Sequence, residues 1–169
     1  MNAADFIIPV SLLCSALLGC STSCLPKGHA WAVQIRSANC LYVAYHPPHV
    51  VLEYVDLLGI QLPEPGTEAY SEALAALSGM VIDTTLKLQY EKEGVGLLER
   101  DPTSCHLCAY VFADGKNVNV EMVRLGWARF CHAQGTKRYA DDFLQAEREA
   151  MANSRGIWRR NNGQEKLPR

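Results

Sequence analysis

The sequence predicts an α+β domain in which five strands form a closed or partly closed barrel, with about three helices between and after them. The chain has 169 residues, 49% of them hydrophobic, which is enough for one core and too few for two ordinary domains. Five segments have strand-like patterns and three have apolar residues at helical spacing. Strands and helices do not alternate regularly, so a parallel βαβ fold is excluded and an antiparallel barrel is expected.

The first three strands are expected in the N-terminal half of the chain. Segments 30–35 and 39–45 are rich in Val, Ile, Tyr and Trp, which favour strands. Pro47 and Pro48 follow, and two prolines remove two ladder donors, so this stretch is a connection and the next strand is predicted over 50–57. A second break at 63–66 precedes a helix predicted over 67–80, where apolar residues recur at helical spacing.

The remaining elements lie in the C-terminal half. Strands are predicted over 81–90 and 107–113, and Asp114-Gly115 is a turn dipeptide. Helices are predicted over 117–128 and 139–153, with Gly156 as the cap that ends the last one. Five strands with this distribution of helices fit a five-stranded OB-type β-barrel.

The first residues have the pattern of a targeting segment. An apolar run over 6–18 has the length of a signal peptide and is too short to span a membrane. Leu17-Leu18-Gly19-Cys20 resembles the lipobox of bacterial lipoproteins, which implies a signal peptide over 1–19, a lipidated Cys20 and a linker over 20–28. The implied location is the bacterial cell envelope, lipid-anchored, or secreted or periplasmic if Cys20 carries no lipid. An uncleaved apolar N-terminus or a misassigned start codon is the alternative, because residues 1–5 contain no Lys or Arg.

Charge is distributed unevenly along the chain. Residues 41–101 contain ten acidic and three basic residues, although the formal net charge of the whole chain is only −2. The last sixteen residues contain five basic residues and one acidic residue, and 161–169 are predicted to be a disordered basic tail after a domain over 29–160. The acidic middle disfavours nucleic-acid binding, which normally depends on Lys and Arg contacts to phosphates.

Seven cysteines are many for a chain of this length. Cys105-x-x-Cys108 and Cys131-His132 suggest zinc ligands, but residues three apart on a strand point to opposite faces, so we favour buried or disulfide-bonded cysteines. A disulfide from Cys105 or Cys108 to Cys131 is the pairing to test first. The sequence alone does not determine the connectivity.

Two segments resemble a known family. Residues 109–129 (AYVFADGKNVNVEMVRLGWAR) are similar to the strand, turn and helix near the end of the staphylococcal nuclease-like barrel, and residues 139–158 resemble its last helix and closing Gly-Ile-Trp. With residues 57–64 (LLGIQLPE), the resemblance covers roughly 31–158. It implies the same barrel fold, and it does not by itself imply the same activity.

The resemblance also implies where a catalytic site would lie. Family nucleases use Ca²⁺ held by carboxylates, a glutamate as general base and two arginines that face the phosphate, because the transition state concentrates negative charge there. Here Asn39 and Gln61 stand at the two metal-aspartate positions, Asp56 and His106 at the two arginine positions, and Glu64 at the glutamate position. Arg36 and Arg100 lie near the expected places of the arginines, but a shift that used them would not restore the aspartates.

Three hypotheses about function follow. The first is a non-catalytic family member that binds an unknown envelope protein or ligand, is attached to the membrane by its lipid, and needs no cofactor. The second is a weak or altered metal-dependent phosphodiesterase that uses Glu64 as general base, together with His106 or His132 in a rebuilt site. Ca²⁺ is expected only if this activity is retained. The third is an OB module that binds nucleic acid without cleaving it.

Overall fold

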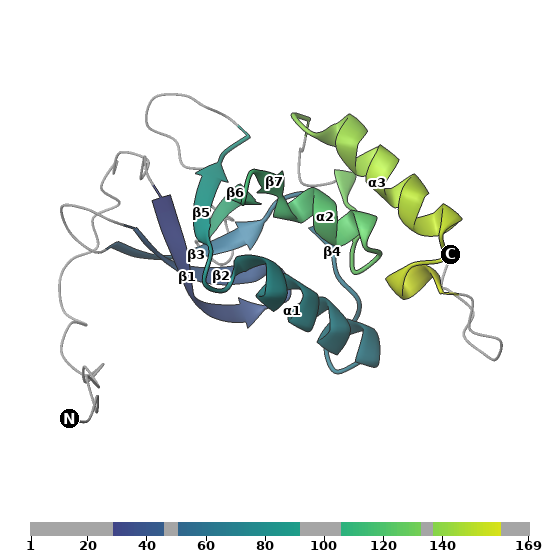
Figure 1. Cartoon of the computed structure of the whole chain (residues 1–169), viewed down its shortest axis with the longest axis horizontal. Coiled ribbons are helices and arrows are strands. Elements are labelled where there is room, and N and C mark those ends of the chain that lie inside the picture. The colour runs from purple at the N-terminus through teal and green to yellow at the C-terminus, as the bar shows by residue number, and fades with distance from the viewer. Residues whose placement is uncertain (1–28, 46–50, 92–105, 133–136, 160–169) are drawn as a thin grey trace.

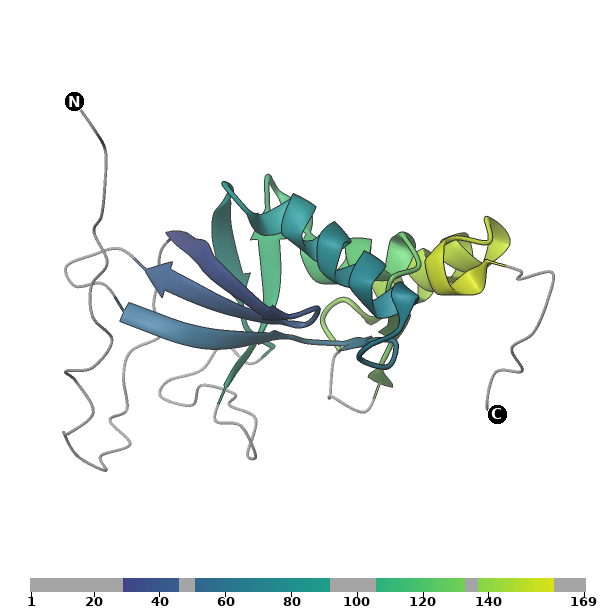
Figure 2. The same ribbon diagram turned by 90° about the horizontal axis from the view of Figure 1, so that it is seen from below.

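The computed structural model describes residues 29–45, 51–91, 106–132 and 137–159. The strands of the barrel lie at one end of the molecule, and the helices extend from it toward the other end (Figure 1 and Figure 2). The predicted α+β class, with a five-stranded OB-like barrel and three α-helices, is confirmed. The barrel strands are β1 (His29–Ser37), β2 (Cys40–Tyr45), β3 (Val51–Leu57), β5 (Thr85–Gln89) and β6 (Leu107–Ala113).

The barrel is mixed, whereas the sequence patterns suggested an antiparallel one. Its strands follow the order β3-β2-β1-β5-β6, and the barrel closes where β3 pairs in parallel with β6. Parallel strands need a long crossover connection. The chain between β3 and β6 is long enough for that purpose and includes α1 (Glu68–Val81) and β5. Register shifts in β1 on either side of Gln34 and Ile35 mark bulges, which bend a strand and help a sheet to curve.

The core of the barrel contains alternate residues of β6. In β6, Leu107, Ala109, Val111 and Ala113 are all at most 6% exposed. The side chains between them lie on the outer face of the barrel, where Tyr110 is covered by Tyr139 and by Phe143 of α3 (Ala140–Ala152). β6 was predicted over the same residues that form it.

Each predicted helix is present. α1 begins after Thr67, whose side chain accepts a hydrogen bond from the backbone N–H of Tyr70. The second helix, α2 (Val118–Arg124), begins after Asn117 in the same way but ends four residues earlier than predicted. It ends there because Leu125 caps it and Gly126 takes a φ of +78°, which a helix does not continue.

Three strands of two residues were not predicted. β4 (Ile60–Gln61) pairs with β8 (Arg129–Phe130), and β7 (Lys116–Asn117) pairs back onto β6. The predicted turn between β6 and β7 is confirmed, since Asp114 and Gly115 both have positive φ, at 49° and 77°. Two successive positive φ values are typical of a type I′ hairpin turn.

The sequence predicted that Gly156 caps the last helix, and this prediction is wrong. Asn153 caps α3, and Ser154 takes the left-handed conformation, with the backbone N–H groups of Ser154 and Arg155 donating to the carbonyls of Met151 and Ala150. Gly156 instead begins a short 3₁₀ helix, η2 (Gly156–Trp158), and packs against the backbone of Gly126. A Cβ on Gly156 would lie 2.1 Å from the Gly126 carbonyl oxygen.

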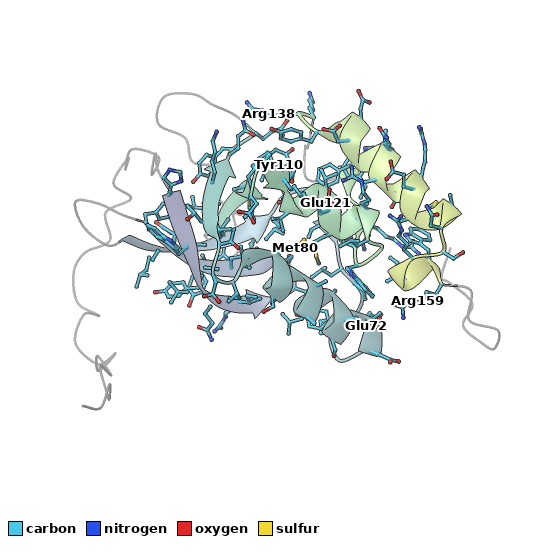
Figure 3. All side chains as sticks on the ribbon, in the orientation of Figure 1. Glu72, Met80, Tyr110, Glu121, Arg138 and Arg159 are labelled. Atoms are coloured by element: carbon cyan, nitrogen blue, oxygen red, sulfur yellow. The ribbon has the colours of Figure 1, made fainter. Side chains whose placement is uncertain are left out.

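The C-terminal segment is also tied to α1. In Figure 3, Glu72 on α1 and Arg159 just after η2 lie on neighbouring parts of the molecule, and their side chains are 3.3 Å apart between Oε1 and Nη1. Arg159 also lies over the Trp127 ring, and Arg129 lies over the Trp158 ring. Both tryptophan rings therefore pack against arginine side chains.

The predicted signal peptide, Cys20, the linker and the basic tail lie outside the described residues. Among the helices of the described ranges, none is long and apolar enough to cross a membrane.

Candidate functional site

Three strands bring a thiol, a carboxylate and an imidazole together on the outer face of the barrel. Cys40 begins β2 and is directly opposite Asp56 of β3 in the antiparallel register. Asp56 is in turn the parallel partner of Cys108 in β6. His106 lies directly before β6 and two residues before Cys108, so the two side chains point to the same side of the sheet. These residues lie far apart in the sequence and meet only because β3 pairs with both β2 and β6.

The side-chain atoms of this cluster are close to one another. His106 Nδ1 is 3.1 Å and 3.2 Å from the two carboxylate oxygens of Asp56, and 3.6 Å from Cys40 Sγ. The three ligand-type atoms all lie within 4.8 Å of one another. The ring of His106 stacks on Tyr54 with 5.0 Å between centroids, which fixes the plane of the imidazole. The side chains of His106 and Asp56 are 27% and 24% exposed, so solvent reaches the cluster.

Cys40 is held as a neutral thiol. Burial is the main reason that the pKa of Cys40 is raised to about 12, and the hydrogen bond and charge of Asp56 raise it further, while Arg36 acts in the opposite direction. The side chain of Cys40 is 4% exposed. A thiol with this pKa contains almost no thiolate at neutral pH, so Cys40 does not have the character of a catalytic nucleophile.

A buried amide holds the strands that carry the cluster. Asn119 of α2 is 0% exposed and donates from Nδ2 to the carbonyls of Leu58, just after β3, and Ala109 of β6. Its Oδ1 accepts from the backbone N–H of Val111 at 2.9 Å. Asn119 therefore fixes the end of β3 relative to β6, and through them Asp56 relative to His106.

A cleft opens beside this cluster at the end of the barrel. Its volume is about 490 Å³, and its lining comes from the β1–β2 turn, β4, the start of α1 and the segment after β8, through Ser37, Asn39, Ile60, Gln61, Leu62, Pro63, Pro65, Tyr70 and Cys131. Asn39 and Gln61, the residues at the two expected metal positions, both contribute to it. Glu64 is exposed and lies between two of the lining prolines.

The cleft does not fit Ca²⁺. Calcium takes six to eight oxygen ligands, usually including carboxylates. Here the Asn39 side-chain oxygen accepts a hydrogen bond from the Ser37 hydroxyl at 2.8 Å, and Gln61 offers a neutral amide. Within the described residues, the one group of three or more metal-type ligands is Cys40, Asp56 and His106. A thiol is a soft donor that calcium does not select.

The other candidate residues are placed as follows. Arg36 lies with its guanidinium carbon 5.9 Å from the centroid of Tyr54, near the cluster, and Arg100 lies outside the described residues. His132 lies against Phe130. Cys108 and Cys131 are present as thiols, and Cys105 lies outside the described residues, so the disulfide stays a prediction.

The resemblance locates Asp56 and His106 individually but does not predict that they contact each other. Two arginines that face the same phosphate must lie close together, so the residues at their positions could have been expected to meet. Cys40 and Asn119 were missed. Asn119 had one signal, a polar residue between two valines on the apolar side of a helix.

The protein has an OB-like α+β fold, because a five-stranded mixed barrel is combined with three helices. A cleft lies at one end of the barrel, with the polar cluster beside it. The family model described as staphylococcal nuclease homologue matches residues 54–160. The chain belongs to this family.

Proposed function

We propose that this protein is a member of the staphylococcal nuclease family without nuclease activity, and that its barrel serves as a binding or structural module. The observation that carries the proposal is the contact between Asp56 and His106, the residues at the two positions where the resemblance expects arginines. Their side chains satisfy each other, whereas two arginines would both be directed at a phosphate.

The charge at this place argues against phosphodiester cleavage. The transition state of that reaction gathers negative charge on the phosphate oxygens, and cations or strong donors must offset it. The Asp56 carboxylate would repel such a phosphate, and the neutral amides of Asn39 and Gln61 replace both expected metal carboxylates. Loss of one oxyanion donor commonly costs about 10²–10³ in rate, and four charged groups are replaced here.

Hydrolysis of single-stranded DNA and RNA by the purified protein with Ca²⁺ tests this proposal. Glu64→Gln is the matched control, because Glu64 is exposed and its removal does not disturb the core. We expect the same background cleavage from both proteins. Calcium-dependent cleavage that Glu64→Gln abolishes would overturn the proposal and support an altered phosphodiesterase.

A second variant tests the reason for inactivity. Asn39→Asp, Gln61→Asp, Asp56→Arg and His106→Arg combined restore every charged group that the family mechanism uses beside Glu64. We expect the combined variant to gain calcium-dependent cleavage that a further Glu64→Gln change removes. If the variant folds, binds Ca²⁺ and still does not cleave, other parts of the cleft limit the reaction.

We further propose that the module is anchored to the cell envelope through a lipid on Cys20, where its partner would be an envelope protein or ligand. The lipobox-like residues 17–20 support this location. Expression in a bacterial host with a labelled fatty acid tests it, and we expect label in the protein and recovery in the membrane fraction. Cys20→Ala should lose both, and label retained in that variant would contradict the proposal.

A further inference from the structure

We propose that Cys40, Asp56 and His106 form a binding site for a borderline transition-metal ion, with Zn²⁺ as the best match. The ligands would be Cys40 Sγ, one carboxylate oxygen of Asp56 and His106 Nδ1. Its ligands differ from Asn39 and Gln61, which stand at the metal-aspartate positions of the family. The proposal does not depend on whether the barrel cleaves nucleic acid.

Two of the three distances between the ligand atoms match a tetrahedral zinc site, and the third, from Cys40 Sγ to the Asp56 oxygen, is at most 4.8 Å. With zinc–sulfur and zinc–nitrogen bonds of about 2.3 and 2.0–2.1 Å, a tetrahedral angle separates the sulfur and nitrogen by about 3.6 Å. The distance between Cys40 Sγ and His106 Nδ1 is 3.6 Å. The same geometry separates nitrogen and oxygen ligands by about 3.3 Å, and His106 Nδ1 lies 3.1 and 3.2 Å from the two Asp56 oxygens.

The chemistry of the ligands selects the ion. A thiolate, an imidazole and a carboxylate are the three ligand types that zinc uses in proteins, while Mg²⁺ and Ca²⁺ prefer oxygen alone. A thiolate and a carboxylate together carry two negative charges, which equal the charge of Zn²⁺. Zinc replaces the Cys40 thiol proton, which leaves to solvent, and the imidazole binds through Nδ1 as the neutral tautomer that carries its proton on Nε2.

The surroundings hold the ligands in place before the ion arrives. Cys40 and Asp56 are register partners on adjacent strands, so their backbone separation is set by the sheet. The imidazole plane is set by its stacking on Tyr54, which itself lies 4.7 Å from the Tyr42 ring, centroid to centroid. Ordered supports of this kind orient metal ligands and strengthen binding.

Three protein ligands leave one position of a tetrahedral ion open. Structural zinc sites usually have four protein ligands, whereas sites with three keep water or an external ligand in the fourth position. His106 and Asp56 are each about a quarter exposed, which allows the fourth position to face solvent. The ion would therefore present an open coordination position on the surface of the barrel, where a carboxylate, imidazole or phosphate oxygen of a partner binds it.

Titration of the full-length, tag-free chain with Zn²⁺ and Co²⁺ under a non-thiol reductant tests the proposal. Cys40→Ser, Asp56→Asn and His106→Gln each remove one ligand, and Cys131→Ser is the matched control because it removes a cysteine that lines the nearby cleft instead. We expect the wild-type protein to bind one zinc ion. Each ligand variant should lower the affinity by about 100-fold or more, because loss of a group that only supports a ligand already costs about 10–100-fold. Cys131→Ser should bind as the wild type does.

Spectroscopy identifies the ligands independently of affinity. Cobalt in the wild-type protein should give a thiolate charge-transfer band and intense tetrahedral d–d bands that Cys40→Ser loses, and X-ray absorption of the zinc form should contain one sulfur at about 2.3 Å. Thermal unfolding without metal checks that the variants are folded, and zinc should raise the wild-type midpoint but not that of Cys40→Ser. Equal zinc binding by Cys40→Ser and wild type, or no binding by the folded wild type, would overturn the proposal.

Discussion

Asn119 is a buried side chain whose amide group donates two hydrogen bonds to the backbone of neighbouring segments and accepts one from it. We expect Asn119→Leu to lower the free energy of unfolding by about 3 kcal/mol or more, because it removes the hydrogen-bond partner of the Leu58 carbonyl and of the Val111 N–H group. It also removes one of the two donors to the Ala109 carbonyl, which keeps the backbone N–H group of Leu58. Urea unfolding followed by circular dichroism measures the loss. Asn153→Ala is the control, since Asn153 is exposed at the end of α3, and its effect should be about 1 kcal/mol or less. A similar effect of both changes would refute the role given to Asn119.

Gly126 and Gly156 allow two backbone segments to come into direct contact. A Cβ on Gly126 would lie 2.3 Å from the Arg155 carbonyl oxygen, and both glycines have positive φ. We therefore expect Gly126→Ala and Gly156→Ala each to destabilise the protein by more than about 2 kcal/mol, through both the clash and the backbone strain. Gly79→Ala is the matched control in α1, where a Cβ meets nothing within 4 Å, and it should stabilise the protein by about 0.5–1 kcal/mol. Comparison of the three unfolding midpoints decides the matter, and a harmless change at Gly156 would exclude the tight contact.

At the scale of elements, Glu91 connects the end of β5 to the start of α3. It accepts a hydrogen bond from the Tyr110 hydroxyl and others from the backbone N–H groups of Lys137 and Arg138. Partial burial acts to raise the pKa of Glu91, but these hydrogen bonds and the charge of Arg138 outweigh it, and the pKa lies below its ordinary value. Figure 3 shows Tyr110 and Arg138 close to each other at this junction.

The lowered pKa of Glu91 predicts an acid-dependent loss of stability. A carboxylate whose pKa is lower in the folded state stabilises the fold above its unfolded pKa of about 4.3, and this contribution disappears as the pH falls through the folded pKa. We expect Glu91→Gln to lower the unfolding midpoint at pH 7 and to have little effect once the pH is well below 4. Thermal unfolding of both proteins from pH 7 to pH 3 measures this, and a difference that stays constant over the range would contradict it.

Elements with a strong local pattern were predicted well. β6 has the predicted bounds, and α1 is displaced by one residue, because alternation and helical spacing are properties of the segment itself. β4 and β8 were missed since each has two residues, and nothing within two residues distinguishes a strand from a loop. The parallel pairing of β3 with β6 was missed for a different reason. It joins residues about fifty positions apart, and no local signal encodes such a contact.

The site was predicted only in part for the same reason. The resemblance located Asn39, Asp56, Gln61, Glu64 and His106, and two of these line the cleft. Cys40 was missed, because its chemistry depends on the residues that lie opposite it when β2 pairs with β3 and β3 pairs with β6. The strand register places the Cys40 thiol beside the other two ligands, and the sequence alone does not predict that register.

At the scale of the whole molecule, the distribution of charge predicts weak binding to nucleic acids. Non-specific affinities of about 10⁻⁴–10⁻⁶ M at physiological salt come from several Lys and Arg contacts to phosphates. The stretch 41–101 supplies β3, the cleft residues of β4, and α1, and it contains ten acidic residues against three basic ones. We expect a dissociation constant for a labelled single-stranded oligonucleotide weaker than about 10⁻⁴ M, measured by fluorescence anisotropy at physiological salt. A variant that ends at Arg160 is the control, because it removes only the tail over 161–169 and separates any contribution of the tail from that of the barrel. Micromolar binding that persists in this shortened variant and weakens steeply with salt would mean that the barrel itself holds a polyanion, and the function would then be that of an OB module for nucleic acid.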